Sequence, residues 1–243
     1  MDEKIVVVGA GLAGLSAVDT LLEGGISPQD ILIIHEGTNP WDRDMYYGFG
    51  GSVWETELVL VKDVNQLTEL YDYLPLEALK VKVSQMEDFI TKYTNGRGTY
   101  SEAEIKLDSE TSTYALKKIW ASFQNKYTTI QGNATCRPIT QISDYIVYDE
   151  VETHTKQVQQ YTKLVLAAGS NGYNIAHSLG EYVANLAQLP LRITTPSTIK
   201  VDANLSLAGV ENTYIVGSIL GYTQPETSII QGIIAGESIL KSL

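Results

Sequence analysis

Three glycines near the start of the chain lie between an apolar run and a helical pattern. Gly9, Gly11 and Gly14 follow Lys4–Val8 and precede leucines and valines at helical spacing. In such a turn the first glycine allows a tight bend, the second lets a pyrophosphate approach the backbone, and the third lets helix and strand pack closely. The helix start offers N–H groups to phosphate oxygens. The spacing therefore predicts a nucleotide-binding turn.

An acidic residue ends the next apolar run, which covers residues 31–34. Glu36 can accept hydrogen bonds from both hydroxyls of an adenosine ribose, whereas an NADP site more often has a basic residue there. A site for NAD alone and a turn without a ligand stay open as alternatives. The predicted nucleotide-binding residues are Gly9, Gly11, Leu12, Ala13, Gly14, Glu36 and Gly37.

The elements that must position these residues form a βαβ unit over the first 36 residues. From 127 onward, alternation with period two predicts a hairpin with its turn near Asp149, and short apolar runs predict buried strands. The expected elements are hairpin strands over 140–148 and 151–161, buried strands over 163–168 and 213–216, a helix near 175–186 and a closing helix over 229–240.

The middle of the chain differs in composition. Between 62 and 126 the density of charged residues rises, and helical patterns occur near 64–74, 84–94 and 113–126. We interpret this stretch as an insertion that forms a cap for a substrate or partner. The predicted domains are therefore a nucleotide-binding domain over 1–61 and 127–243, and an inserted region over 62–126.

Charge and composition exclude several classes of function. The 243 residues carry a net charge of −12, which disfavours binding to nucleic acid or to an anionic membrane. One cysteine, Cys136, rules out an internal disulfide or a CxxC pair, and three scattered histidines predict no metal site. No signal-peptide pattern and no long apolar run occur, so we expect a cytoplasmic protein.

Two later motifs resemble those of FAD proteins: Val165–Gly169, and Asn212–Ser218 followed by a helix from about Ser228. With the glycine turn, they make the chain similar to the FAD-dependent oxidoreductases with a glutathione-reductase-like first domain. Within that group, Glu211–Gly221 most resembles the flavin-bearing electron-transfer component of anaerobic glycerol-3-phosphate dehydrogenase, which works beside a separate catalytic chain. The resemblance covers the two ends of the chain, about half of it.

The resemblance implies an α/β, Rossmann-type FAD/NAD(P)-binding fold with a parallel sheet, a β-meander and a small α-rich insertion. It implies FAD rather than FMN as cofactor, and a possible partner subunit that carries the electron acceptor. Ser218 stands where most of these proteins have Asp. Arg43 is placed to serve a phosphate or a ribose. The further cofactor-binding residues that it implies are Gly50, Gly51, Ala134, Ala168, Gly169, Gly217, Ser218, Ser228 and Ile229.

The chain has one GxGxxG motif and no CxxC pair, which argues against a reductase driven by a nicotinamide. Electrons should therefore come from an organic substrate or a protein partner. His177 is a candidate base, and Arg97 and Arg192 are candidates for binding an anionic substrate group. We expect a dehydrogenase for a small substrate resembling glycerol 3-phosphate, with a non-nicotinamide acceptor. The alternatives are a non-catalytic electron-transfer protein of a larger complex and a flavin-binding scaffold.

Overall fold

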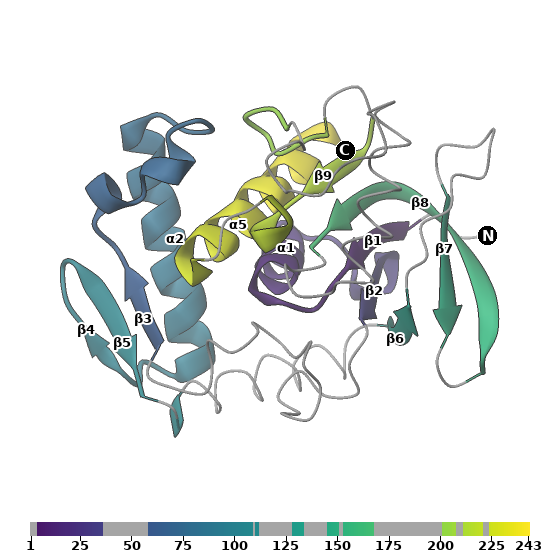
Figure 1. Ribbon diagram of the computed structural model, residues 1–243, viewed down its shortest axis with the longest axis horizontal. Helices are drawn as coiled ribbons and strands as arrows, with labels where there is room; N and C mark the ends of the chain where they lie inside the picture. Colours follow the sequence, from purple (N-terminus) through teal and green to yellow (C-terminus); the bar gives the residue numbers. More distant parts are fainter. Residues whose placement is uncertain are drawn as a thin grey trace.

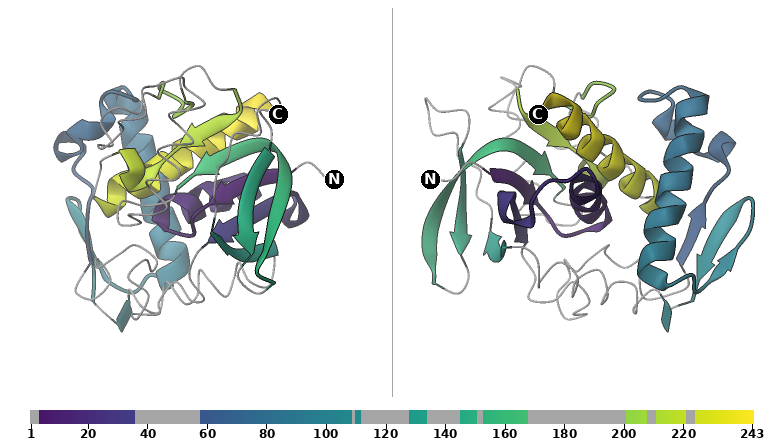
Figure 2. Two further views of the ribbon diagram at one scale, coloured as in Figure 1. Left: turned by 45° about the vertical axis from the view of Figure 1, so that its right-hand side comes forward. Right: turned by 180° about the vertical axis from the view of Figure 1, so that it is seen from behind.

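The chain folds around a mainly parallel sheet, with helices α1 and α5 on one side and an antiparallel extension on the other (Figure 1). A smaller unit built on helix α2 packs against α5, so that α5 lies between α1 and α2 (Figure 2). The computed structural model describes residues 4–35, 58–108, 110–111, 128–133, 145–150, 153–167, 201–207, 211–220 and 224–243.

The predicted βαβ unit is confirmed. Strand β1 (Lys4–Val8) leads into helix α1 (Leu12–Glu23), and strand β2 (Ile31–His35) returns to pair in parallel with β1. The core residues of both strands are almost completely buried. Continuous apolar runs are what a parallel strand covered on both faces requires, and this is why the unit can be recognised in the sequence.

One long strand takes the place of two predicted ones. β8 (Thr155–Leu166) pairs antiparallel with β7 (Tyr145–Glu150) over its first half, and β7 pairs with β6 (Thr128–Asn133), which gives the β-meander. From Tyr161 onward β8 pairs in parallel with β1, with a register shift between Lys4 and Ile5. The predicted second strand of the hairpin, 151–161, and the predicted buried strand, 163–168, are thus a single strand that changes partner. The parallel order is β6, β2, β1, β8, β9.

The last part of the chain returns to the first helix. Strand β9 (Thr213–Ile215) is followed by a 3-10 turn, η6 (Gly217–Leu220), and by helix α5 (Pro225–Ser242). A Cβ atom at Gly232 would lie 2.0 Å from the Ser16 Oγ and 2.2 Å from the Ala13 carbonyl oxygen. The Ser16 hydroxyl donates a hydrogen bond to the Ile229 carbonyl at 3.0 Å. The two helix backbones are therefore in direct contact.

The smaller unit contains a sheet that the sequence patterns did not predict, with order β3-β5-β4. Its strands have four residues or fewer, too short to show a period. The elements are β3 (Leu58–Val61), the 3-10 turns η3 (Val64–Gln66) and η4 (Thr68–Leu70), α2 (Leu76–Thr94), β4 (Thr99–Tyr100) and β5 (Glu104–Leu107).

The expectation of a helix over 64–74 is wrong, because this stretch holds only the two 3-10 turns. Pro75 is the N-cap of α2, and a residue before proline is pushed out of the helical region, so no helix can run from 74 into α2. The helix expected near 84–94 exists and begins earlier, at Leu76. The helices expected near 113–126 and 175–186 lie outside the described residues. In the part of the chain that the structure describes, no helix is both long and apolar enough to span a membrane.

The contact between α1 and α5 predicts the effect of a single methyl group. Gly232→Ala should lower the free energy of unfolding by about 2 kcal/mol or more, because the new Cβ overlaps the backbone of α1. Helix propensity alone would favour alanine by about 1 kcal/mol. Urea unfolding, with the exposed Lys241→Ala of the same helix as control, measures the difference. A G232A variant as stable as the wild type would contradict the close contact.

Candidate functional site

Three parallel strands end side by side at one edge of the sheet. Val8 of β1 lies opposite Leu166 of β8, which lies opposite Ile215 of β9. Beyond these ends, the Ala167 N–H donates to the Val8 carbonyl at 2.8 Å, and the Val216 N–H donates to the Leu166 carbonyl at 3.0 Å. In open α/β sheets ligands bind outside the carboxyl ends of strands. This edge is therefore the candidate site.

The first glycine turn has the geometry that the sequence predicts. Gly9 has φ +104°, a conformation open to few other residues. A Cβ at Gly14 would lie 2.1 Å from the Gly9 carbonyl oxygen and 3.4 Å from the Cβ of Ala167. Both positions thus require glycine, Gly9 for the turn itself and Gly14 for the packing of helix on strand.

Gly11 requires a different explanation. It is the N-cap of α1, with φ −78°, and no side chain caps this helix start. A Cβ there would meet no atom of the described residues within 4 Å. Neither strain nor packing among the described residues therefore demands glycine at this position. The open space over the start of α1 fits a phosphate group, because a helix N-terminus attracts anions.

The other end of the chain brings a second turn to the same place. Gly217 has φ +80°, and a Cβ on it would lie 3.0 Å from the Cβ of Ala13 and 3.9 Å from the Ser228 Oγ. Ser218 follows in η6, and Ile229 is fully buried in α5. The structure thus brings the predicted residues of the first turn together with those of the last strand and the closing helix.

The first two turns of α5 carry unpaired polar atoms. Gln224 Oε1, Glu226 Oε2 and Gln231 Nε2 are buried and have no hydrogen-bond partner among the described residues. Buried polar atoms are nearly always paired, so each of these needs an explanation. Of the three, only Gln231 is at the Gly217 turn, where its Oε1 accepts from the Gly217 N–H, whereas Glu226 lies beside Val61 of β3. The feature that fits a dinucleotide is the free space at Gly11, next to the Ala13–Gly217 contact.

Glu226 is a buried acid that the sequence reasoning missed. Its side chain is on α5, only 3% of the residue is exposed, and its carboxyl lies near the backbone N–H of Val61 in β3. Burial, with a smaller effect of the nearby Glu69 carboxylate, raises the pKa of Glu226. Thr227 donates to that Glu69 carboxylate at 3.3 Å. In sequence, an acid in the first turn of a helix is ordinary, and only the packing against β3 reveals its burial.

Of the predicted catalytic residues His177, Arg97 and Arg192, only Arg97 lies within the described residues. Arg97 is exposed in the turn that joins α2 to β4. Among the described residues, no group of three or more His, Cys, Asp or Glu side chains could hold a metal ion. The predicted site residues that lie outside the described ranges stay predictions: Glu36, Gly37, Arg43, Gly50, Gly51, Ala134, Ala168, Gly169, His177 and Arg192.

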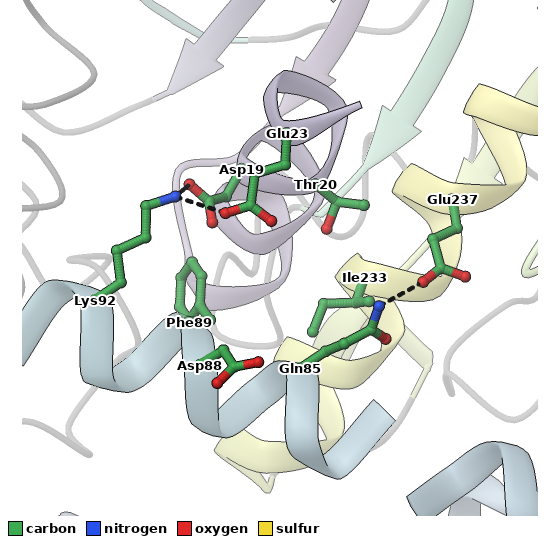
Figure 3. A pocket seen from close by; sticks show the side chains of 9 residues that line it. All are labelled: Asp19, Thr20, Glu23, Gln85, Asp88, Phe89, Lys92, Ile233 and Glu237. Atoms are coloured by element: carbon green, nitrogen blue, oxygen red, sulfur yellow. Dashed lines mark hydrogen bonds and ion pairs between the residues drawn. The ribbon is translucent and has the colours of Figure 1, made fainter. Parts of the chain in front are cut away.

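A cavity of about 450 Å³ lies elsewhere, among helices α1, α2 and α5 (Figure 3). Lys92 donates to Asp19 at 2.8 Å and to Glu23 at 2.9 Å, which joins α2 to α1. Gln85 donates to Glu237 at 2.9 Å, and Lys82 also binds Glu237, which joins α2 to α5. These pairs connect the smaller unit to the rest of the protein, and the cavity lies where the two meet.

The order of the parallel strands and the glycine turn at the edge of the sheet define a dinucleotide-binding α/β protein. The sequence pattern of the family described as pyridine nucleotide-disulphide oxidoreductase matches residues 3–231. The chain belongs to this family. It is an FAD-dependent oxidoreductase, which confirms the fold class, the cofactor and the enzyme class expected from the sequence.

Solved structures share the fold at low sequence identity. THI4 from Thermovibrio ammonificans aligns with a TM-score of 0.57 at 14% identity, over 99% of this chain and 89% of that one. A mutant FrdA of E. coli quinol fumarate reductase aligns with a TM-score of 0.55 at 11% identity, over 76% of this chain and 37% of that one. Comparison with curated proteins gives no match.

The open space at Gly11 predicts a variant that folds but does not bind FAD. Gly11→Val should weaken FAD binding by about 100-fold, roughly 3 kcal/mol, because its side chain occupies the space for the pyrophosphate. Its Tm should stay close to that of the wild type. Gly14→Ala should instead lower the Tm, because its Cβ meets the Gly9 carbonyl. Flavin fluorescence and thermal melts separate the two effects, and FAD binding by G11V at wild-type affinity would contradict the assignment.

The raised pKa of Glu226 predicts a dependence of stability on pH. Since the folded state holds the proton more tightly, this group stabilises the fold at low pH, and the contribution is lost as pH rises through the folded pKa. Between about pH 5 and about pH 8, the Tm of the Glu226→Gln variant should therefore fall less than the Tm of the wild type. Glu77→Gln, which changes an exposed acid on α2, is the control. Parallel Tm curves for wild type and E226Q would show that Glu226 is not buried as described.

Proposed function

We propose that the chain is an FAD-dependent dehydrogenase that oxidises a small organic substrate resembling glycerol 3-phosphate and passes the electrons to a non-nicotinamide acceptor. One observation supports this most directly. The glycine turn at the start of α1 and the Gly217 turn before α5 meet at one edge of the sheet, with open space at Gly11. A single extended dinucleotide could contact both turns.

The residues that would hold FAD form two groups. Those at the start of α1 would bind the pyrophosphate through backbone N–H groups, and those beside η6 and α5 would bind the flavin side. Bound FAD would supply the two-electron chemistry, which a chain with a single cysteine cannot supply through a dithiol of its own. The first group is Gly9, Gly11, Leu12, Ala13 and Gly14, and the second is Gly217, Ser218, Ser228 and Ile229.

The family name includes a disulphide, yet this chain has one cysteine, so a redox dithiol cannot form within it. It also has only one GxGxxG motif. Both facts support an organic electron donor and an acceptor other than a nicotinamide. The acceptor would be carried by a partner protein, in line with the resemblance of Glu211–Gly221 to the electron-transfer component of glycerol-3-phosphate dehydrogenase.

The inserted region over 62–126 would cap the substrate. Glu226 is at the junction between α5 and this region, where its Oε2 can hold a proton. A hydroxyl substrate must lose a proton when it is oxidised, and Glu226 joins His177 as a candidate to receive it. Arg97 and Arg192 would bind an anionic group such as a phosphate.

The same resemblance to an electron-transfer component favours a second function, in which the chain is not itself catalytic. In that case the flavin would be reduced by a partner protein and not by a small molecule. The two functions share the cofactor site and differ in whether a substrate reacts at it.

An anaerobic absorption spectrum tests the proposal. The protein loaded with FAD should show a band near about 450 nm, and glycerol 3-phosphate should bleach it. Dithionite serves as the positive control for reduction, and the G11V variant as the control without bound flavin. A band that dithionite bleaches and glycerol 3-phosphate leaves unchanged would contradict the proposed substrate and favour the electron-transfer function.

A further inference from the structure

A carboxyl group is buried where the two units of the protein meet. Glu226 is in the first turn of α5, and its carboxyl lies near the backbone N–H of Val61 in β3. The next residue, Thr227, is fully buried and donates a hydrogen bond to the Glu69 carboxylate of η4 at 3.3 Å. Because β3 and η4 belong to the smaller unit, the start of α5 contacts that unit through two acidic residues.

No basic group compensates a negative charge on Glu226 among the described residues that act on it. The charged group that faces it is Glu69, whose carboxylate adds to the effect of burial in raising the pKa of Glu226. On the β3 side, Lys62 is engaged elsewhere, since it pairs with Glu87 of α2 at 2.7 Å and donates to the Ser101 carbonyl at 2.8 Å. In the arrangement that the structure shows, which we call closed, Glu226 therefore keeps its proton more tightly than an exposed glutamate does.

Loss of that proton is linked to separation of the two units. An ionised carboxyl is poorly tolerated in a buried place, and a second carboxylate nearby increases the cost. Water reaches Glu226 only when β3 and η4 move away from the start of α5. Since the closed arrangement binds the proton more tightly, it is favoured at low pH, and this advantage is lost as pH rises through the folded pKa.

The other contacts between the two units leave room for such a movement. The cavity of about 450 Å³ among α1, α2 and α5 shows that the helices are not packed continuously there (Figure 3). Beside it, the attachment is polar: Glu237 binds Lys82 and accepts from Gln85 of α2. Glu237 is about 16 Å from Glu226 along α5, from the rise of a helix. The smaller unit can therefore stay attached at Glu237 while it separates from the start of α5.

We propose that Glu226 is a proton-operated latch: with its proton bound it holds the smaller unit closed on the start of α5, and when it gives the proton to solvent the smaller unit moves away. The latch itself follows from the contacts at this junction. Its effect on the reaction rests on the proposed function, in which the smaller unit caps the substrate, so that opening would expose the substrate site.

Distances between spin labels on the two units test the latch. Val81 of α2 and Val158 of β8 are both exposed, and α2 and β8 lie at opposite ends of the molecule (Figure 1). The labels are attached to V81C and V158C in a full chain whose single cysteine is replaced by Cys136→Ser, without FAD. A second pair, on V158C and K241C, has both labels on the larger unit and serves as the control. Double electron–electron resonance gives the distance distributions at about pH 5 and about pH 8.

We expect the first pair to show a second, longer distance whose share rises with pH. The ratio of open to closed molecules should rise by up to about tenfold per pH unit, because one proton is released on opening. The control pair should not change. Glu226→Gln cannot lose a proton and should keep the short distance at both pH values, whereas Glu77→Gln, which changes an exposed acid on α2, should behave like the wild type.

A second variant changes the neighbouring charge instead of the latch. Glu69→Gln keeps an oxygen that can accept from Thr227 and removes the carboxylate that faces Glu226. The share of the longer distance should then rise less with pH than in the wild type. Since the wild-type and E69Q measurements leave Glu226 in place, they test the latch even if E226Q fails to fold.

The latch and the proposed function fail in different ways. A distance between the two units that does not depend on pH would overturn the latch, and so would the same pH dependence in wild type and E226Q. Equal changes in both label pairs would show that Glu226 stabilises the whole fold and would overturn it as well. Because FAD is absent from the measurement, a protein that opens with pH but whose flavin glycerol 3-phosphate does not reduce would support the latch and contradict only the proposed function.

Discussion

The direct contact between the first and the last helix is the constraint on which the rest of the structure depends. Gly232 brings the backbone of α5 against Ser16 and Ala13 of α1, and the Ser16 hydroxyl binds the Ile229 carbonyl. A side chain at Gly232 would force the helices apart. Because the start of α5 is fixed in this way, the Gly217 turn lies next to the first turn of α1. Segments more than 200 residues apart thus form one site.

That site combines two backbone turns. At Gly11 the protein offers open space and a helix start, which suits a charged phosphate. At Gly217 a second turn, in contact with Ala13, lies beside that helix start. The acidic Glu226 adds a proton-holding group where α5 meets β3. The salt bridges of Lys92 attach the smaller unit from the opposite end of α1 and leave this edge of the sheet to the ligand.

Much of the nucleotide-binding fold could be predicted from the sequence, since buried parallel strands and the glycine turn have strong local patterns. The smaller unit could not, because its strands are short and the stretch 64–74, whose apolar spacing resembles that of a helix, forms two 3-10 turns. In the site, Gly217 was found by resemblance. Glu226 and Gln231 were not, because burial by a distant segment leaves no mark on the local sequence.

The most direct test of this account is a crystal structure of the chain with FAD. The account predicts that the pyrophosphate occupies the space over Gly11 at the start of α1, and that the flavin side of the molecule extends past the Gly217 turn toward α5. FAD bound at another edge of the sheet, or a protein side chain filling the space over Gly11, would contradict it.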